Sequence, residues 1–315
     1  MKLSIVTINR NNAAGLEKTM LSVASQTCKV FEYIVVDGAS TDGSVEMIKK
    51  LEPEFGKRLK WISEPDKGIY NAMNKGIRMA SGEYIQILNS ADCLAADDVT
   101  ERMLAALEKA GNPSIYYGNM IKCFPDGHNK VDKSFAGAEI TMLGMYTGTL
   151  NHDPAYIRRD LFDKYGYYDE SLKIVSDWKW YLQAIILGEE KSQYIDINVT
   201  LFDMTGISET NKELDKVERK QVLEHMFPKA ILADYERFSF PIDQIKRLQR
   251  HPWAYKMVWF LERCLFKKEK RQNRRKYRIN GECNIPSSYY SIPKHNMLRK
   301  PSIAYFRRLS PTMSL

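Results

Sequence analysis

Short apolar segments alternate with stretches of helical periodicity near the start of this chain. Residues 3–8, 31–36 and 84–88 are runs of mostly apolar, β-branched or aromatic residues with the length of a buried strand. Between them, residues 16–26 and 69–80 repeat their apolar side chains at helical spacing. Strands that alternate with helices form βαβ units, in which the strands lie parallel. We therefore predict an α/β fold with a mostly parallel central sheet and flanking helices.

Each of these strands leads into a polar or acidic residue. The first reaches Asn9, the second ends at Asp37, and the third is followed by Asp92. Because the carboxyl ends of parallel strands meet at one edge of a sheet, where ligands bind in open α/β folds, these side chains should face one crevice. A turn is the alternative interpretation for any one strand end, since Asn, Ser and Asp are ordinary turn residues. Three such ends together predict a binding site.

The middle of the chain continues the alternation. We predict helices over residues 95–110 and 212–227, and strands over residues 114–122 and 195–202, with a hairpin turn at residues 125–127. A composition change near residues 228–241 marks a boundary. It divides the chain into a domain of residues 1–235 and an extension of residues 236–315.

The extension is predicted to be helical and basic. Residues 251–266 are apolar and aromatic with few charges, and residues 267–278 directly after them are strongly basic. An interfacial helix beside a polybasic patch can hold a protein on an anionic leaflet. The alternative is a helix packed on the first domain, followed by a solvated tail. No nucleic-acid recognition module accompanies the charge, so we expect no nucleic-acid partner.

Composition indicates the compartment. Hydrophobic residues make up 44% of the chain, enough for a core, but no apolar run reaches the roughly 18 residues of a transmembrane helix. Residues 1–6 are too short an apolar run for a signal peptide. The five cysteines lack CxxC spacing, which fits a reducing compartment and argues against zinc. We expect a cytoplasmic protein with peripheral contact at the inner face of the cell membrane through residues 251–278, where its net charge of +8 would favour an anionic partner.

Five motifs in order give the chain a family resemblance. They are Ser4-Ile5-Val6-Thr7, Val35-Val36-Asp37-Gly38-Ala39-Ser40-Thr41-Asp42-Gly43-Ser44, Glu64-Pro65-Asp66-Lys67-Gly68-Ile69-Tyr70-Asn71-Ala72-Met73-Asn74-Lys75-Gly76, Gly82-Glu83-Tyr84 and Leu88-Asn89-Ser90-Ala91-Asp92. With Asn151-His152, Ser176-Asp177-Trp178 and Gly206-Ile207-Ser208, the chain resembles the family 2 inverting glycosyltransferases of the GT-A fold over about residues 2–210. It is most similar to the branch that builds bacterial exopolysaccharides such as colanic acid.

The resemblance implies a nucleotide pocket. It implies that Asp37 accepts a hydrogen bond from the donor base, as a carboxylate can from a ring N–H, and that Asp66 contacts the nucleoside. The residues expected to line the rest of this pocket are Thr7, Asn9, Ser90 and Lys75, the last by reaching the diphosphate. For Lys75, a solvated helix face is the alternative.

Asp92 is the predicted metal ligand. The family usually carries Asp-x-Asp here, whereas this chain has Ser90-Ala91-Asp92, so Asp92 stands alone. A single carboxylate, diphosphate oxygens and water suit Mn²⁺ or Mg²⁺, which take oxygen ligands. His152 is a candidate for a further metal ligand or for an acceptor contact, against the alternative of a structural histidine.

Asp177 is the predicted catalytic base. An inverting transfer needs a carboxylate that takes the acceptor hydroxyl's proton on the side of the sugar away from the metal. Asp177 lies on a segment separate from Asp92, and its Ser-Asp-Trp context matches the family. The alternatives are a helix N-cap for Asp177, and Asp169 or Glu170 as the base. Trp178 is a candidate for shaping the acceptor site, or else a core residue.

These expectations describe one enzyme. We predict an inverting, metal-assisted glycosyltransferase that moves a sugar from a nucleoside-diphosphate sugar, UDP-linked by preference, to a hydroxyl of a growing surface glycan. The glycan acceptor implied by the branch is lipid-linked. Two alternatives remain: a nucleotidyltransferase, although residues 9–12 lack the glycines of its phosphate loop, and a non-catalytic GT-A scaffold that binds a membrane or a partner.

Overall fold

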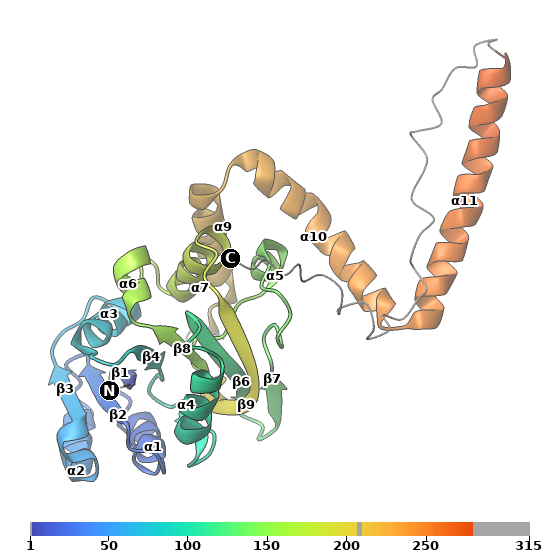
Figure 1. The fold of residues 1–315 in the computed structure, drawn as a ribbon. Coiled ribbons are helices and arrows are strands. Elements are labelled where there is room, and N and C mark those ends of the chain that lie inside the picture. The colour runs from blue at the N-terminus through green and yellow to red at the C-terminus, as the bar shows by residue number, and fades with distance from the viewer. Residues whose placement is uncertain (1, 207–209, 280–315) are drawn as a thin grey trace, which may run out of the picture. The chain divides into compact units, whose positions relative to one another are not determined.

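The structure is a computed structural model that describes residues 2–206 and 210–279 (Figure 1). By its internal contacts the chain divides into two compact units, Met1–Ile242 and Asp243–Leu315. The predicted boundary at residues 235/236 falls inside a continuous helix, α10 (Lys229–Gln249). The candidate site belongs to the first unit.

One nine-stranded sheet organises the first unit. Its strands are β1 (Leu3–Asn9), β2 (Phe31–Asp37), β3 (Leu59–Ser63), β4 (Tyr84–Ile87), β5 (Cys93–Leu94), β6 (Ile115–Cys123), β7 (Asn129–Asp132), β8 (Ala155–Arg158) and β9 (Ser192–Asp203). They lie in the order β3-β2-β1-β4-β8-β6-β9-β5, and β7 pairs with β6. β1 to β4 are mutually parallel neighbours, as are β6 and β9, whereas β8 runs antiparallel to both β4 and β6. The predicted mostly parallel α/β sheet is confirmed.

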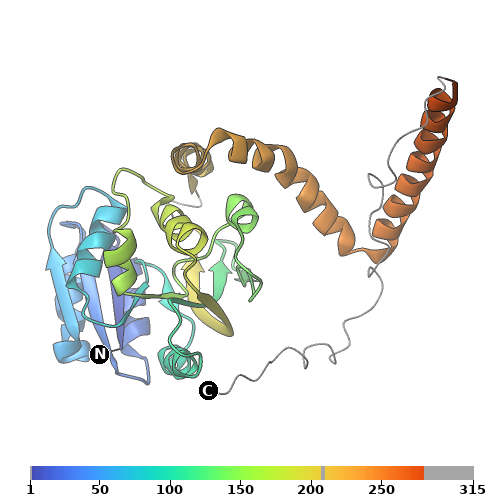
Figure 2. The same ribbon diagram turned by 45° about the horizontal axis from the view of Figure 1, so that its top comes forward.

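Helices cover both faces of the sheet (Figures 1 and 2). They are α1 (Ala13–Ala24), α2 (Ser44–Phe55), α3 (Ile69–Met79), α4 (Val99–Lys109), α5 (Met142–Thr147), α6 (Asp160–Tyr165), α7 (Ser176–Tyr181) with its π-helical continuation (Leu182–Leu187), and α9 (Lys212–Met226). A short 3₁₀ turn, Gly56–Arg58, follows α2. Two layers of helices require strands that are apolar on both sides, which explains their near-continuous apolar sequences.

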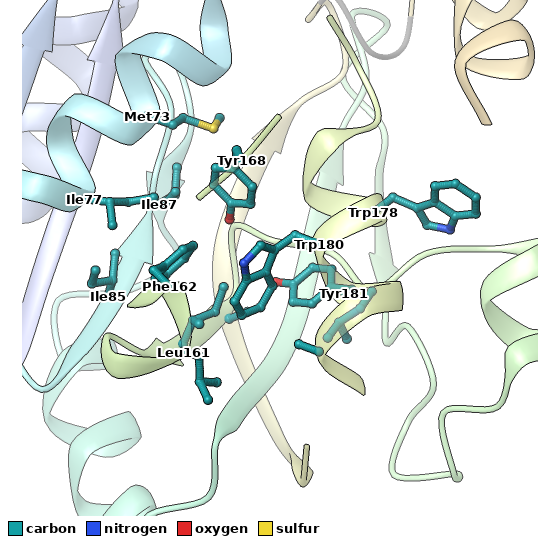
Figure 3. Close-up of a cluster of buried hydrophobic side chains, with 14 of the residues drawn as sticks. Met73, Ile77, Ile85, Ile87, Leu161, Phe162, Tyr168, Trp178, Trp180 and Tyr181 are labelled. Atoms are coloured by element: carbon teal, nitrogen blue, oxygen red, sulfur yellow. The ribbon is translucent and has the colours of Figure 1, made fainter. Parts of the chain in front are cut away.

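Successive strand residues therefore enter two different cores. On β2, Tyr33 and Val35 pack with side chains of α1, α2 and α4, whereas Ile34 and Val36 pack with those of α3. The second of these cores is the larger and continues under α6 and α7, where Phe162 stacks on Trp180 with ring centroids 4.8 Å apart (Figure 3). Because both cores consist mainly of apolar side chains, the polar residues of the candidate site lie where strands β1 and β4 end.

Strand β8 differs from the sequence prediction. Residues 155–158 form β8, although the sequence predicted only a helix that starts at Arg158. The segment has four residues, too few to show an alternating pattern before α6 begins at Asp160. Its insertion beside β4 brings the residues just before it, His152 and Asp153, to the carboxyl edge of β4.

The second unit is described by its helices alone. α10 crosses its start and contains Pro241, and α11 (Pro252–Ile279) follows. The large apolar side chains exposed on α11 are Trp253, Met257, Val258, Trp259, Phe260, Leu261, Leu265 and Phe266. No helix in the part of the chain that the structure describes is long and apolar enough to cross a membrane. The basic residues 294–308 lie outside the described residues.

Candidate active site

Two adjoining cavities open near the carboxyl ends of β1 and β4. We call them the Asp92 cavity, of about 460 Å³, and the Asp177 cavity, of about 280 Å³, after one lining residue of each. Four residues line both and so form their common wall: Ile69, Asn89, His152 and Phe202. The predicted residues Asn9, Asp66 and Ser90 line the Asp92 cavity, and Trp178 lines the Asp177 cavity.

Thr7 and Asp37 lie behind the Asp92 cavity and line neither space. The buried Thr7 hydroxyl donates to the Leu88 carbonyl oxygen at 2.7 Å and accepts from the Tyr33 hydroxyl at 3.0 Å. These contacts hold β1 against the end of β4. They thereby fix the backbone from which the residues after each strand extend.

The Asp37 carboxylate is enclosed by donors. Asn9 donates to it at 2.9 Å, the Ser40 hydroxyl at 2.6 Å and the Ser63 hydroxyl at 2.7 Å. Burial raises the pKa of Asp37, but these hydrogen bonds outweigh burial and hold the pKa below its usual value. Asp37 is therefore a charged anchor for the Asn9 amide, whose oxygen accepts from the Ser90 hydroxyl at 2.9 Å.

Asp66 sits against the turn that follows β2. A Cβ atom at Gly38 would collide with the Asp66 carboxylate, so only glycine leaves room for this approach. Asp66 accepts from the Gly68 backbone N–H at 3.0 Å, and Arg10 lies 3.8 Å from it across the cavity mouth.

Lys75 points elsewhere. Its ammonium group contacts Glu64 at 2.8 Å and donates to the Pro65 carbonyl oxygen at 2.9 Å. It lines neither cavity, so in this structure it fastens α3 to the loop before it.

Asp92 is nearly buried beside a second carboxyl group. Its Oδ1 accepts from the Asp203 backbone N–H at 2.9 Å. Burial first, and then the neighbouring charge of Asp153, raise the pKa of Asp92 well above its usual value. Asp153 was not predicted as a site residue, because a single Asp before Pro154 is an ordinary turn residue.

His152 joins the two cavities. Its Nδ1 lies 3.2 Å from Asp177 Oδ2, and its Nε2 lies 3.1 Å from the Asn89 amide and 3.5 Å from Asp153 Oδ1. Burial lowers the pKa of His152, but the charge of Asp153 and the hydrogen bond and charge of Asp177 outweigh burial and raise it to about 10. The ring is thus an imidazolium at neutral pH, and its two nitrogens are both donors.

The protonated ring also explains an unpaired amide oxygen. Asn89 Oδ1 is buried without a hydrogen-bond partner. If the amide turns half a rotation, this oxygen faces the Nε2–H of His152 and both groups are satisfied. In that arrangement neither His152 nitrogen offers a lone pair to a metal ion, so the geometry favours a bridging role.

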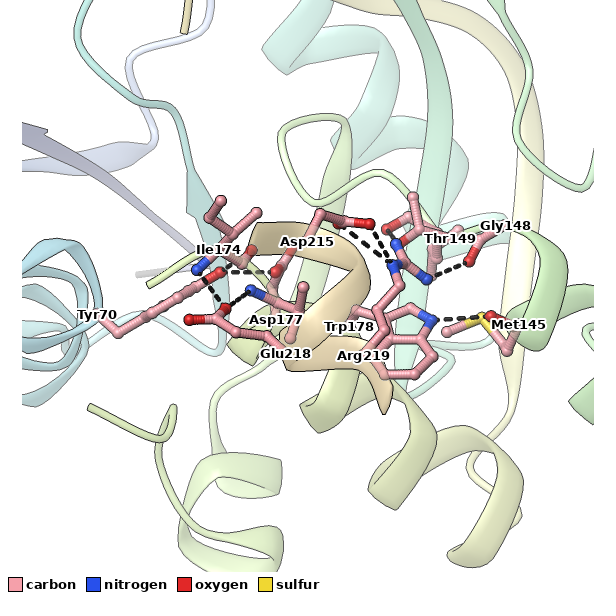
Figure 4. Close-up of polar contacts among 12 residues, drawn as sticks. Tyr70, Met145, Gly148, Thr149, Ile174, Asp177, Trp178, Asp215, Glu218 and Arg219 are labelled. Carbon is pink, nitrogen blue, oxygen red and sulfur yellow. Dashed lines mark hydrogen bonds and ion pairs between the residues drawn. The ribbon is translucent and has the colours of Figure 1, made fainter. Parts of the chain in front are cut away.

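Asp177 is an ionised carboxylate at the start of α7. It accepts from the Tyr70 hydroxyl at 2.9 Å (Figure 4). It also pairs with His152. Burial raises the pKa of Asp177, yet the His152 hydrogen bond and charge, together with Tyr70, bring it below its usual value. Its side chain keeps 16% of its surface exposed, toward the Asp177 cavity. It can therefore receive a proton from a ligand there.

Helix α9 fastens the segment that carries Asp177. The buried Glu218 carboxylate accepts the backbone N–H groups of three successive residues, Lys173, Ile174 and Val175, at 2.8–3.3 Å (Figure 4). Arg219, one residue on, lies over the Trp178 ring at 4.4 Å. Trp178 is itself buried and donates to the Met145 carbonyl oxygen at 2.8 Å.

The residues at Asp92 fit a divalent cation of the oxygen-binding kind. Within residues 2–206 and 210–279, no group of three or more His, Cys, Asp or Glu side chains is arranged to hold a metal. However, Mg²⁺ and Mn²⁺ at phosphate sites use one or two carboxylates and complete their shell with phosphate oxygens and water. Asp92 supplies one such carboxyl group in the Asp92 cavity. The motif residues Ile207 and Ser208 lie outside the described residues.

Comparison with known sequences gives one family. A family model described as Glycosyl transferase family 2 matches residues 4–170. A PGL/p-HBAD biosynthesis glycosyltransferase of Mycobacterium bovis is 27% identical over 217 residues, which are 69% of this chain and 82% of that protein. An uncharacterized glycosyltransferase of Mycobacterium tuberculosis is 30% identical over 242 residues, 75% of this chain and 82% of the relative.

Solved structures share the fold. Residues 1–349 of TarS from S. aureus, in complex with UDP, match with a TM-score of 0.55 and 20% identity, over 64% of this chain and 60% of that chain. A mannosyltransferase from Pyrobaculum calidifontis, in complex with GDP-Man and Mn²⁺, matches with a TM-score of 0.56 and 16% identity, over 81% of this chain and 72% of that chain. At these identities the likeness concerns the architecture of the sheet and its helices.

Proposed function

Because the chain belongs to glycosyltransferase family 2, as its motifs predicted, we propose that it is an inverting enzyme that moves a sugar from a nucleoside diphosphate to a glycan hydroxyl. Asp177 is the general base and Asp92 binds the metal. The family assignment makes the chain a transferase and favours this activity over the nucleotidyltransferase and scaffold alternatives.

The observation that carries the proposal is the pair of adjoining cavities. A direct displacement at the anomeric carbon needs the leaving diphosphate and the attacking hydroxyl on opposite sides of the sugar. The Asp92 cavity offers the Asp92 carboxyl group on one side, and the Asp177 cavity offers an ionised carboxylate on the other. His152, which lines both, marks where the transferred sugar would lie.

The nucleotide occupies the Asp92 cavity in this proposal. Asp66, Asn9 and Ser90 contact the nucleoside and diphosphate directly, whereas Asp37 and Thr7 act by holding these residues in place. Lys75 reaches the diphosphate only if its contact with Glu64 breaks. TarS has been solved with UDP and with UDP-GlcNAc, which supports a UDP-linked donor as the first to test.

Mn²⁺ or Mg²⁺ is the proposed cofactor. When bound at Asp92, such an ion neutralises the charge that builds up on the departing diphosphate. The protein's own part is to present the Asp92 carboxylate, which the Asp203 backbone N–H orients, and to enclose it from bulk water.

Asp177 then moves the proton. As the acceptor oxygen bonds to the anomeric carbon and the bond to the diphosphate breaks, the hydroxyl proton passes to the Asp177 carboxylate. Base assistance of this kind is worth roughly 10²–10⁴-fold in rate. Tyr70 and His152 hold both carboxylate oxygens, so the base is oriented before the acceptor arrives.

The proposed acceptor is an anionic, lipid-linked glycan of a surface-polysaccharide pathway, met at the inner membrane face. Basic side chains that line the Asp177 cavity are Lys122, Lys173, Lys212 and Arg219. They would suit a phosphate-bearing acceptor. On α11, exposed aromatic side chains precede the basic residues 267–278, a combination suited to an anionic leaflet.

The test separates binding from transfer. Asp177→Asn should lower kcat by roughly 10²–10⁴-fold, because an amide cannot take the proton, and should leave UDP binding in the presence of Mn²⁺ unchanged. Transfer from a panel of UDP- and GDP-sugars and calorimetric titration with UDP measure the two effects. Asp160→Asn, an exposed carboxylate outside both cavities, is the control. A wild-type transfer rate in Asp177→Asn would contradict the assignment of Asp177 as the general base.

A further inference from the structure

Four residues form the wall that the two cavities share. In the proposed function the anomeric carbon is attacked from the Asp177 cavity and leaves a diphosphate in the Asp92 cavity. The sugar ring then lies where the two cavities meet. The residues that line both are Ile69, Asn89, His152 and Phe202. The transferred sugar therefore meets these four side chains.

Two of the four side chains are polar and already held in place. The Asn89 amide and the His152 ring lie 3.1 Å apart, and His152 also pairs with Asp177. Polar groups at fixed positions orient a ligand in a pocket but supply little of its apolar contact area. That contact area has to come from the other two residues.

The two apolar side chains of the wall differ in how the fold uses them. Ile69 begins α3 and packs against the larger core. Phe202 is half-buried, yet among residues 2–206 and 210–279 it belongs to neither core. A partly exposed aromatic side chain is ordinary on a convex surface, but Phe202 lines two concave spaces. Its ring is placed to contact a ligand.

The backbone of Phe202 is fixed between the two proposed reaction partners. On one side, β9 pairs Phe202 in register with Lys122 of β6, a residue that lines the Asp177 cavity. On the other side, the next residue, Asp203, donates its backbone N–H to Asp92 at 2.9 Å. A side chain carried by a paired strand presents its ring from a well-defined position.

We propose that Phe202 is the surface on which the transferred sugar packs, and that it sets how tightly the enzyme holds the sugar part of its donor. A pyranose ring presents C–H groups on one face and hydroxyl groups around its rim. The C–H groups suit the negative face of an aromatic ring, and the hydroxyl groups suit polar side chains such as Asn89. The inference rests on the proposed function and adds a residue that acts on the sugar and not on the nucleotide.

The test compares each nucleotide sugar with its own nucleotide. Calorimetric titration with Mn²⁺ present measures the affinity of the full chain for UDP, GDP and the UDP- and GDP-sugars of the transfer panel, beginning with UDP-GlcNAc. Phe202→Leu keeps an apolar side chain but removes the ring, so it should bind the preferred nucleotide sugar roughly two- to tenfold more weakly. Its affinity for the free nucleotide should equal that of the wild type.

Further variants separate ring packing from a structural role. Phe202→Tyr keeps the ring and should bind the nucleotide sugar as the wild type does. Phe202→Met lacks the ring and should repeat the loss, which covers failure of the leucine variant to fold. Phe124→Leu is the matched control, because Phe124 is also half-buried, stacks on His128 at 4.1 Å and lines neither cavity.

The outcomes distinguish this inference from the proposed function. If Phe202 only supports the fold, Phe202→Leu should weaken binding of nucleotide and nucleotide sugar equally and lower the melting temperature. That result, or unchanged affinity for every nucleotide sugar, would overturn the role of Phe202 and leave the proposed function standing. A wild type that binds none of the nucleotide sugars in the presence of Mn²⁺ would overturn both.

Discussion

At the scale of single residues, the site depends on the positive charge of His152, which lies among three acidic side chains. The imidazolium of His152 lies between Asp177 on one side and Asp92 with Asp153 on the other. Its charge keeps Asp177 ionised although the carboxylate is largely enclosed. A base that must be free of its proton before the acceptor arrives benefits from such a neighbour.

The pH dependence of transfer should reveal the effect of the His152 charge on Asp177. His152→Gln removes the positive charge, so the pKa of Asp177 rises and the acidic limb of the kcat–pH profile moves to higher pH. Below that limb the base is protonated and transfer falls. Profiles measured from pH 4 to 9 would show the shift, with Asp160→Asn as the unaffected control. An unchanged acidic limb would contradict the coupling.

Residue identity was easier to predict than side-chain direction. Asn9, Asp66, Ser90 and Asp92 follow strand ends or their turns, and all line the predicted crevice. Thr7 and Asp37 sit at equivalent positions by sequence but line neither cavity. The Leu88 carbonyl oxygen accepts from Thr7, and the Asn9 and Ser63 side chains donate to Asp37. Such contacts depend on partners far along the chain and are invisible in a local pattern. The roles of these residues remain predictions.

At the scale of elements, the alternation of strands and helices was sufficient to predict the fold. The parallel strands β1 and β2 are long, mostly apolar and buried, and the sequence identifies them. β8 was not predicted because it has only four residues. Its pairing with β4, which places Asp153 near the end of β4, was therefore not predicted either. Tyr70 and Glu218 were missed for a related reason, since each acts on a segment about 40 or more residues away.

Helix α9 fixes the position of Asp177 through residues 173–175, the segment just before α7. Glu218→Gln leaves one oxygen for three backbone N–H groups, so buried donors are left unpaired at a cost of roughly 1–3 kcal/mol. We expect a lower free energy of unfolding in urea, and a larger loss in kcat than in donor affinity because Asp177 loses its fixed position.

Helix α9 also provides the control for this prediction. Glu213→Gln changes an exposed residue of the same helix that pairs with Lys216. It should alter neither the free energy of unfolding nor kcat by a measurable amount, since exposed pairs contribute little. Equal effects of the two substitutions would show that the Glu218 contacts do not matter.

At the scale of the whole molecule, the two units have different surfaces. The first contains two buried apolar cores, whereas α11 exposes large apolar side chains such as Trp253, Phe260 and Leu265. Exposed apolar side chains in this density mark an interaction site. The basic residues 267–278 that end the helix favour an anionic surface over a neutral one.

Vesicle binding tests this surface. The full chain should co-sediment with vesicles that contain anionic lipid and not with neutral ones, and added salt should weaken the binding because it screens the basic residues. Trp259→Glu with Phe260→Glu should abolish co-sedimentation, since both side chains are exposed apolar residues of α11. Glu262→Gln on the same helix is the control. Equal binding to neutral vesicles would contradict the electrostatic part.

The way α9 holds Asp177 has a consequence for how such chains diversify. The residues that the family model matches, 4–170, include Asn9, Asp66 and Asp92 on the proposed donor side. Asp177 and the helix that fastens it lie beyond that segment. In the proposed function, substitutions in this later part would alter how the acceptor is received and would leave the lining of the donor cavity unchanged.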